Sequence, residues 1–253
     1  ADADAAVGRG TVVLGLMAGN GKITQADAEE AIVLLKNDRG LLPLAKTAKT
    51  IAIIGAHADV GVLSGGGSSQ VYPVGGRAVQ GLQPATWPGP VIYYPSSPMK
   101  ALQARYPGAK ITFHDGKDPA AAAKLAAASD LAIVFADQWT TESEDVWTLS
   151  LPKNQDATIA AVAAANAKTI VVLETGGPVL MPWLKEVGAV VQAWFPGTSG
   201  GEAIARVLTG EVDASGRLPV TFPKDVAQLP RPKLDGDPKA PETPFDVDYT
   251  IEG

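Results

Sequence analysis

Short apolar runs rich in Ile and Val recur along this chain, and they limit its fold more than any other feature. Each run has the length of a strand and carries few charges, without strict alternation of apolar and polar residues. Such runs are typical of strands that are buried on both faces of a sheet. They are "TIAIIG" (50–55), "KITFHD" (110–115), "LAIVFAD" (131–137), "TIVVLETG" (169–176) and "AVVQAWF" (189–195).

Segments with helical composition lie before and between these runs. Asp118 followed by Pro119 predicts a helix start, Gly210 predicts a helix end, and Thr24 with Asp27 resembles a capping box. Strands that alternate with helices indicate an α/β fold with a mostly parallel sheet and helices on both faces. The expected helical segments are "TQADAEEAIVLLKN" (24–37), "DPAAAAKLAAAS" (118–129), "NQDATIAAVAAANA" (154–167), "PVLMPWLKEV" (178–187) and "SGGEAIARVLTG" (199–210).

The two ends of the chain differ from this pattern. "GRLPVTFP" (216–223) predicts one last short strand, and its prolines favour an edge or antiparallel position. We expect residues 1–22 to form an arm or the remnant of a preceding domain. Residues 23–225 are expected to form the α/β-sandwich domain, and residues 226–253 a Pro- and acid-rich C-terminal extension.

Composition excludes several classes of function. The net charge is −6 and the basic residues are scattered, so neither nucleic acid nor a membrane is an expected partner. The chain has no cysteine, which removes disulfides, thiolate metal sites and cysteine nucleophiles. Its two histidines, His57 and His114, lack the spacing of a helical metal motif, so we expect no metal and no cofactor.

A Gly-rich segment follows the first predicted strand, "GAHADVGVLSGGGSSQVYPVGG" (55–76). The GxGxxG and GxxxxGK(S/T) patterns are both absent, so a nucleotide site is the least favoured of three interpretations. The other two are a flexible turn and a loop whose backbone comes close to a ligand or to another domain. In the last of these, His57, Asp59, Ser68 and Ser69 supply polar contacts.

An acidic and aromatic segment, "DQWTTESEDVWTLSLP" (137–152), follows the third predicted strand. Carboxylates beside tryptophan suit sugar chemistry, because an indole offers a platform for a pyranose ring and raises the pKa of a neighbouring carboxyl by desolvation. The alternative is a solvated acidic loop whose tryptophan packs on the core, and local composition favours this alternative. A further loop, "WFPGTSGGEAIA" (194–205), indicates a tight turn in which Thr198 or Ser199 caps the next helix.

Four segments in this order resemble the second, α/β-sandwich domain of glycoside hydrolase family 3, the β-glucosidase and exo-glucanase family. The resemblance covers roughly residues 25–225. The segments are "AIVLLKNDRGLLPL", "TIAIIGAHADVGVLSGGGSS", "ESEDVWTLSLPKNQ" and "PGTSGGEAIARVLTGEVDASGRLPVTFP". The third is similar to the family pattern E-G-x-D-R-x-x-L-x-L-P-x-x-Q, although Ser143 stands where glycine is usual and Val146 where arginine is usual.

The resemblance implies a role for each matching position. Glu142 takes the place of the general acid/base. Where some members carry a stacking tryptophan after the glycine pair this chain has Gly67, so Trp139 or a residue of another chain is expected to stack on the sugar. Substrate contacts are expected from Trp139, Gly66, Gly67, Ser68 and Ser69, and a loop-shaping role from Glu144, Asp145, His57 and Asp59.

The family further implies retaining hydrolysis of a β-linked glucoside or oligosaccharide by two carboxylates about 5–5.5 Å apart. Its nucleophile is an Asp on a TIM-barrel domain, and this sequence holds no such motif. We therefore expect the chain alone to be inactive and to need a barrel domain or chain as partner, in a periplasmic or secreted enzyme. The alternatives are a non-catalytic carbohydrate-binding or structural domain and a flavodoxin-like nucleotide domain.

Overall fold

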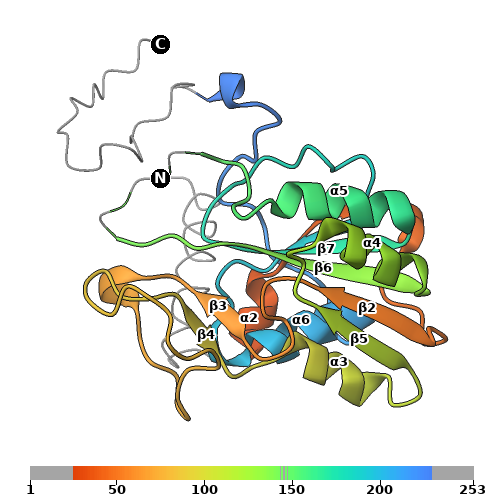
Figure 1. Cartoon of the computed structure of the whole chain (residues 1–253), viewed down its shortest axis with the longest axis horizontal. Coiled ribbons are helices and arrows are strands. Elements are labelled where there is room, and N and C mark those ends of the chain that lie inside the picture. The colour runs from red at the N-terminus through yellow and green to blue at the C-terminus, as the bar shows by residue number, and fades with distance from the viewer. Residues whose placement is uncertain (1–24, 143, 145, 147, 230–253) are drawn as a thin grey trace.

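A six-stranded sheet forms the centre of the chain in the computed structural model, which describes residues 25–142, 144, 146 and 148–229 (Figure 1). Its strand order is β1-β8-β7-β6-β2-β5. Strands β5, β2, β6, β7 and β8 run parallel, and β1 pairs antiparallel with β8 at one edge. The bounds are β1 Val33–Asn37, β2 Thr50–Ile54, β5 Lys110–His114, β6 Leu131–Gln138, β7 Thr169–Thr175 and β8 Ala189–Gln192.

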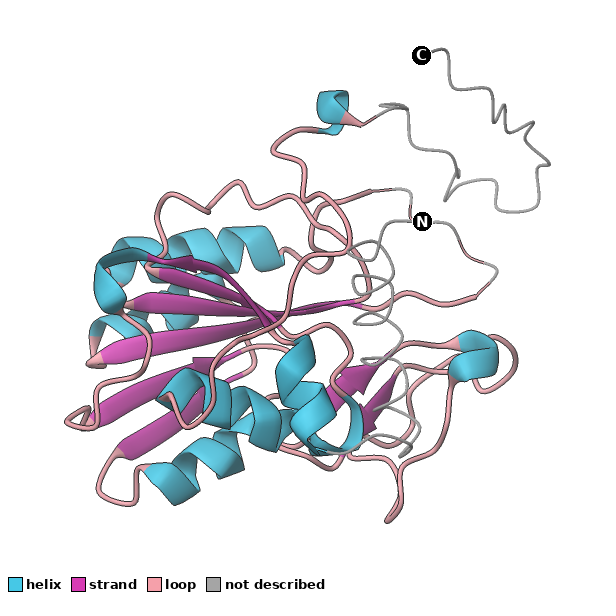
Figure 2. Ribbon diagram, turned by 180° about the vertical axis from the view of Figure 1, so that it is seen from behind, coloured by secondary structure: helices cyan, strands magenta, loops and turns pink. Residues whose placement is uncertain are grey.

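Helices cover both faces of this sheet, as Figure 1 and the view from behind in Figure 2 show. One face carries α2 (Gln25–Ala31), α3 (Pro98–Arg105) and α6 (Gly200–Thr209), and the other carries α4 (Pro119–Ala127) and α5 (Gln155–Ala165). Short 3₁₀ turns are η1 (Asp38–Gly40), η2 (Gly67–Ser69), η3 (Gly197–Ser199) and η4 (Val226–Gln228). The predicted α/β sandwich is confirmed.

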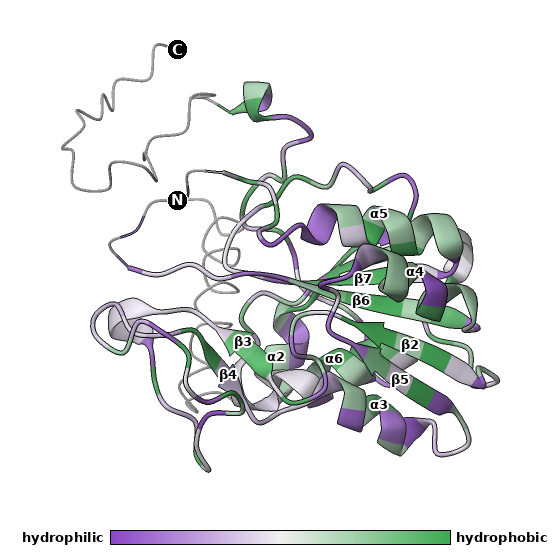
Figure 3. Ribbon diagram, in the orientation of Figure 1, coloured by the Kyte–Doolittle hydropathy of each residue, from purple (hydrophilic) through white to green (hydrophobic). Residues whose placement is uncertain are grey.

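The strand side chains explain why both faces are covered. Along β2, Ile51 and Ile53 enter the core cluster on the side of α6, whereas Ala52 and Ile54 enter the cluster on the side of α5. Because successive strand residues point to opposite faces, a continuously apolar strand needs a packing layer on each. The strands are accordingly among the most apolar parts of the fold (Figure 3).

Local signals place several helix ends where the sequence predicts them. The Asp118 carboxylate accepts hydrogen bonds from the amides of Ala120 and Ala121, with Pro119 at the first helical position. Gly210 ends α6 in the left-handed conformation at φ +74°. Of the two predicted caps of α6, Thr198 and Ser199, it is Ser199 that precedes the helix, and it makes no side-chain cap.

The segment expected as one helix over 24–37 is a helix followed by a strand. Helix α2 ends at Ala31, and Val33–Asn37 form β1, which pairs with β8. The Val-Leu-Leu run fits either period, and pairing with a neighbouring strand decides the outcome. Thr24, predicted to begin a capping box, lies outside the described residues.

Two further predicted elements are absent from the described chain. Residues 178–187 form turns rather than a helix, since Pro182 lacks the amide that a helix interior requires. Residues 216–223 form no strand, because Pro219 and Pro223 cannot donate to a ladder. The antiparallel edge strand of the sheet is β1 instead.

Two further strands and one helix of the described chain were not predicted, although Ser97 before Pro98 is the same kind of helix-start signal as Asp118 before Pro119. Strands β3 (Val62–Ser64) and β4 (Ile92–Tyr94) form a separate antiparallel pair, and helix α3 follows with Ser97 as its N-cap. Strand β5 was expected to be buried on both faces, but it lies at the sheet edge and is partly exposed.

The expected N-terminal arm and most of the C-terminal extension lie outside the described residues. Of the predicted extension 226–253, the structure describes only residues 226–229, which include η4. Within the described part of the chain, no helix is long and apolar enough to cross a bilayer.

Candidate active site

The carboxyl ends of the parallel strands bring two predicted loops together. The segment after β6 begins at Trp139, and the Gly-rich segment 55–76 follows β2 and contains β3, with its three consecutive glycines directly after β3. They meet where the amide of Gly66 donates to the carbonyl oxygen of Thr140 at 3.1 Å. Because ligands of open α/β sheets bind beyond the carboxyl ends of the strands, this edge is the first place to look for a site.

Glu142 contacts the Gly-rich segment directly. Its Oε2 accepts a hydrogen bond of 2.7 Å from the amide of Ser68. The side chain and amide of Ser68 lower the pKa of the Glu142 carboxyl, because these hydrogen bonds stabilise its ionised form. The direction is opposite to the rise expected from a neighbouring indole, so Glu142 is ionised at neutral pH in this chain.

Glu142 lines an open depression of about 380 Å³. The depression contains backbone and hydroxyl groups of both loops and one aromatic ring, that of Phe195. Glu142 is the one carboxylate among the described residues that line it: Gly65, Gly66, Ser68, Ser69, Thr140, Thr141, Glu142 and Phe195. Gly66, Ser68 and Ser69 thus lie beside Glu142, while Gly67 is buried behind it.

Trp139 is half-buried and packs on the apolar cluster of Leu63, Tyr93 and Phe195. A Cβ at Gly66 would lie 2.4 Å from the Trp139 ring, so the glycine makes room for the indole. The indole Nε1 is buried and has no hydrogen-bond partner in the described chain. Trp139 therefore lies close to the depression but does not line it, and its predicted role in stacking on a sugar stays a prediction.

Of the four residues expected to shape the loops, the structure describes His57, Asp59 and Glu144. His57 is exposed, has a left-handed backbone at φ +53°, and packs edge-on against Tyr93 with ring centroids 4.6 Å apart. Asp59 is half-buried, and its Oδ1 has no partner among the described residues. Glu144 lines a separate hollow with Trp139, and Asp145 lies outside the described residues.

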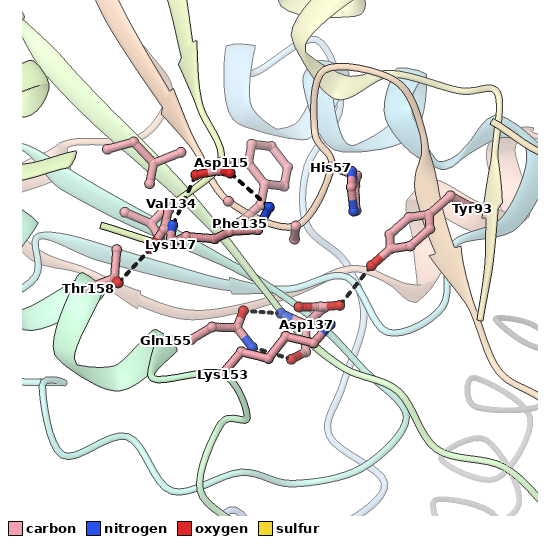
Figure 4. A pocket seen from close by; sticks show the side chains of 14 residues that line it. His57, Tyr93, Asp115, Lys117, Val134, Phe135, Asp137, Lys153, Gln155 and Thr158 are labelled. Carbon is pink, nitrogen blue, oxygen red and sulfur yellow. Dashed lines mark hydrogen bonds and ion pairs between the residues drawn. The ribbon is translucent and has the colours of Figure 1, made fainter. Parts of the chain in front are cut away.

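Sequence reasoning missed a buried acidic pair at the same edge. Asp137 and Glu174 are register partners on β6 and β7, and both are buried. Tyr93 donates a hydrogen bond of 3.0 Å to Asp137 Oδ2, and burial together with Asp137 raises the pKa of Tyr93 (Figure 4). An acid near the end of each of two apolar runs, "VFAD" and "VVLET", was the available signal.

Glu174 is fully buried, and neither carboxyl oxygen has a hydrogen-bond partner of regular geometry among the described residues. Burial raises the pKa of Glu174 well above its ordinary value, and the charge of Asp137 raises it further. The Leu63 backbone acts weakly in the opposite direction. Burial therefore favours the protonated form of Glu174.

Asp137 also lines a pocket of about 100 Å³ between the carboxyl ends of β2 and β6 (Figure 4). Its polar groups mostly bond to one another. Gln155 accepts from the Asp137 amide and donates to the Asp137 carbonyl, and Thr158 donates to Gly116. These hydrogen bonds link α5 to the sheet. The exposed carboxylate that lines this pocket, Asp115, is paired with Lys117 at 3.0 Å, whereas the carboxylate of Glu142 forms no ion pair with a described residue. No cluster of three His, Asp or Glu suited to a metal occurs among the described residues.

Known proteins are similar to this chain in sequence and in fold. Thermostable beta-glucosidase B of Acetivibrio thermocellus is 35% identical over 227 residues, which cover 83% of this chain and 27% of that protein. Beta-glucosidase B of Emericella nidulans is 54% identical over 114 residues, 43% of this chain and 14% of that protein. The chain thus spans less than a third of either relative.

Solved structures agree with these relatives. A β-glucosidase from Streptomyces venezuelae in complex with D-glucose superposes with a TM-score of 0.66 at 26% identity, covering 79% of this chain and 38% of that one. A β-D-glucoside glucohydrolase from Trichoderma reesei gives 0.66 at 27% identity, covering 90% and 32%. The family described as glycosyl hydrolase family 3 C-terminal domain matches residues 32–252. This chain belongs to glycosyl hydrolase family 3 and corresponds to the C-terminal domain of its β-glucosidases.

Proposed function

We propose that this chain is the acid/base-bearing domain of a retaining, exo-acting β-glucosidase, with Glu142 as the proton donor and acceptor. The observation that carries the proposal is an exposed carboxylate at the carboxyl edge of the sheet, at the position of the family's acid/base motif. The substrate class, a β-linked glucoside or oligosaccharide, follows from relatives named β-glucosidases.

The second carboxylate of a retaining mechanism has to come from outside the depression described above. Glu142 is the one acid among the described residues lining it, and retention needs a nucleophile about 5–5.5 Å away. We propose that a barrel domain supplies this nucleophile, since the chain spans 27% of the Acetivibrio thermocellus relative. The isolated chain is then expected to lack hydrolytic activity.

In this mechanism Glu142 works in both half-reactions. Its protonated form gives a proton to the glycosidic oxygen while the nucleophile attacks the anomeric carbon and the C–O bond breaks. Its carboxylate then takes a proton from the water that releases the glycosyl group. The pKa of Glu142, lowered in this chain, is expected to rise when a second carboxylate and the substrate enclose it.

Replacing Glu142 tests the proposal in the longer β-glucosidase that carries this domain. Glu142→Gln should slow hydrolysis of an alkyl glucoside by about 10²- to 10⁴-fold, because the leaving oxygen then departs without a proton. A dinitrophenyl glucoside needs no proton and should form the glycosyl-enzyme at a nearly normal rate, measured as a burst of dinitrophenol.

Glu186→Gln is the control, since Glu186 is an exposed acid that does not line the depression. It should leave both substrates within about twofold of the unaltered enzyme, as expected of a surface substitution. Equal losses on the two substrates in Glu142→Gln would remove Glu142 from the acid/base role.

A further inference from the structure

Gly67 is the residue that lets Glu142 lie against the Gly-rich segment. It is buried and has φ +82°, a conformation that L side chains rarely adopt. A Cβ at this position would lie 2.4 Å from Glu142 Cβ and 3.0 Å from both the Glu142 amide and Oε2. The first two of these atoms are not the flexible tip of a side chain, so any residue larger than glycine displaces Glu142.

Backbone contacts fix this segment from two sides. The amide of Gly66 donates to Thr140 at 3.1 Å, and the amide of Gly67 donates to the carbonyl of Pro88 at 3.2 Å. The amide of Gln70 closes the turn on the carbonyl of Gly67 at 2.9 Å. The direction of the Ser68 amide is therefore set by the surrounding backbone.

The Ser68 amide makes the two oxygens of Glu142 different. It donates to Oε2 at 2.7 Å, and a backbone N–H can only donate. A carbonyl oxygen accepts an N–H hydrogen bond better than a hydroxyl oxygen does, so the Ser68 amide favours the protonated form in which Oε2 is the carbonyl oxygen and the hydrogen is on Oε1.

We propose that Gly67 and the Ser68 amide are positioning residues for Glu142, holding Oε2 so that Oε1 is the atom that delivers and recovers the proton. This rests on the acid/base role proposed above. In the first step the Oε1–H bond breaks, the proton passes to the glycosidic oxygen, and the electrons of the broken C–O bond stay on the leaving group. The charge left on the carboxylate is stabilised by the Ser68 N–H, and Oε1 later takes a proton from water.

A pair of glycine substitutions tests the positioning in the 253-residue chain. Gly67→Ala and Gly76→Ala both place an alanine at positive φ, +82° and +89°, but no atom lies within 4 Å of a Cβ at Gly76. Carboxyl carbon shifts of Glu142 are followed by NMR against pH. Gly67→Ala should raise the pKa of Glu142 towards its ordinary value, because the Ser68 hydrogen bond is lost, and Gly76→Ala should leave it unchanged.

The unaltered chain provides a second measurement that does not depend on folding of a variant. The Ser68 amide proton shift should follow the titration of Glu142, and Glu142→Gln should abolish that pH dependence. The positioning is refuted if the Ser68 amide shift stays constant over the pH range in which Glu142 titrates. It is also refuted if Gly67→Ala is folded and the pKa of Glu142 is unchanged in it.

Kinetics separate the two proposals. In the longer enzyme, Gly67→Ala should lower kcat on an alkyl glucoside by about 10²-fold, as a displacement of about 1 Å can, while Gly76→Ala stays within about twofold. If the Glu142→Gln enzyme is fully active, the acid/base role is refuted, whereas the NMR result on the position of Glu142 still holds. If Glu142→Gln is impaired and Gly67→Ala is not, the positioning fails and the acid/base role stands.

Discussion

Trp183→Ala should lower the free energy of unfolding by about 3–5 kcal/mol, the range for truncating a buried aromatic residue. Trp183 is 1% exposed and packs among the apolar residues between α5 and the sheet. Its Nε1 donates to Asp156 Oδ1 at 2.8 Å, so truncation leaves a cavity and removes the indole donor from a half-buried carboxyl. Urea unfolding followed by circular dichroism measures the change, with an unaltered dependence on urea expected.

Two further substitutions separate the contributions of Trp183. Trp183→Phe keeps most of the packing and removes the hydrogen bond to Asp156, so a loss of about 1–2 kcal/mol is expected. Trp87→Ala is the control, since Trp87 is 60% exposed, and it should change stability by less than about 0.5 kcal/mol. A Trp183→Ala variant as stable as the control would contradict the structure of the 178–187 segment.

Glu174→Gln should stabilise the chain increasingly as the pH rises above about 5. Glu174 is fully buried beside Asp137 of β6, near Tyr93 of β4, and burial raises its folded-state pKa well above the ordinary value of 4.5. Well below pH 4.5 the carboxyl is protonated in both states and does not change stability with pH. Above pH 4.5 the unfolded chain releases this proton freely, whereas the folded chain retains it.

Folding stability therefore falls with rising pH until the folded-state pKa is reached, by up to about 1.4 kcal/mol per pH unit from this one group. Glutamine does not titrate, so the stability difference between Glu174→Gln and the unaltered chain should shift towards the variant from pH 5 upwards. Urea midpoints at several pH values measure this. Glu186→Gln, at an exposed acid, is the control and should give a constant difference. A constant difference for Glu174→Gln as well would mean that Glu174 is not held protonated.

The parts of the fold that the sequence predicted are those with strong local causes. Strand β6 is apolar throughout, α4 begins at Asp118 and Pro119, and α6 ends at Gly210. The errors have two causes. Val33–Asn37 is a strand because the distant β8 lies beside it, whereas residues 178–187 and 216–223 contain prolines that oppose a helix and a strand.

The candidate site divides in the same way. Glu142 and the Gly-rich segment were predicted from a motif, because the residue types and their spacing are written in the chain. The hydrogen bond between the Ser68 amide and Glu142 joins residues 74 positions apart, so no local sequence pattern predicts it. The need for glycine at position 67 likewise comes from Glu142 and not from its own neighbours in the chain.

By itself, the sequence determined the α/β class and the two loops at the carboxyl edge, since periodicity is a property of a linear chain, and its resemblance to a family motif indicated Glu142 as the candidate acid. Only the tertiary structure decided that Asp137 and Glu174 share a buried edge, that Trp139 packs on the apolar cluster, and which oxygen of Glu142 is held. Those features depend on desolvation and on hydrogen bonds between distant segments, and both exist only once the sheet has brought the segments together.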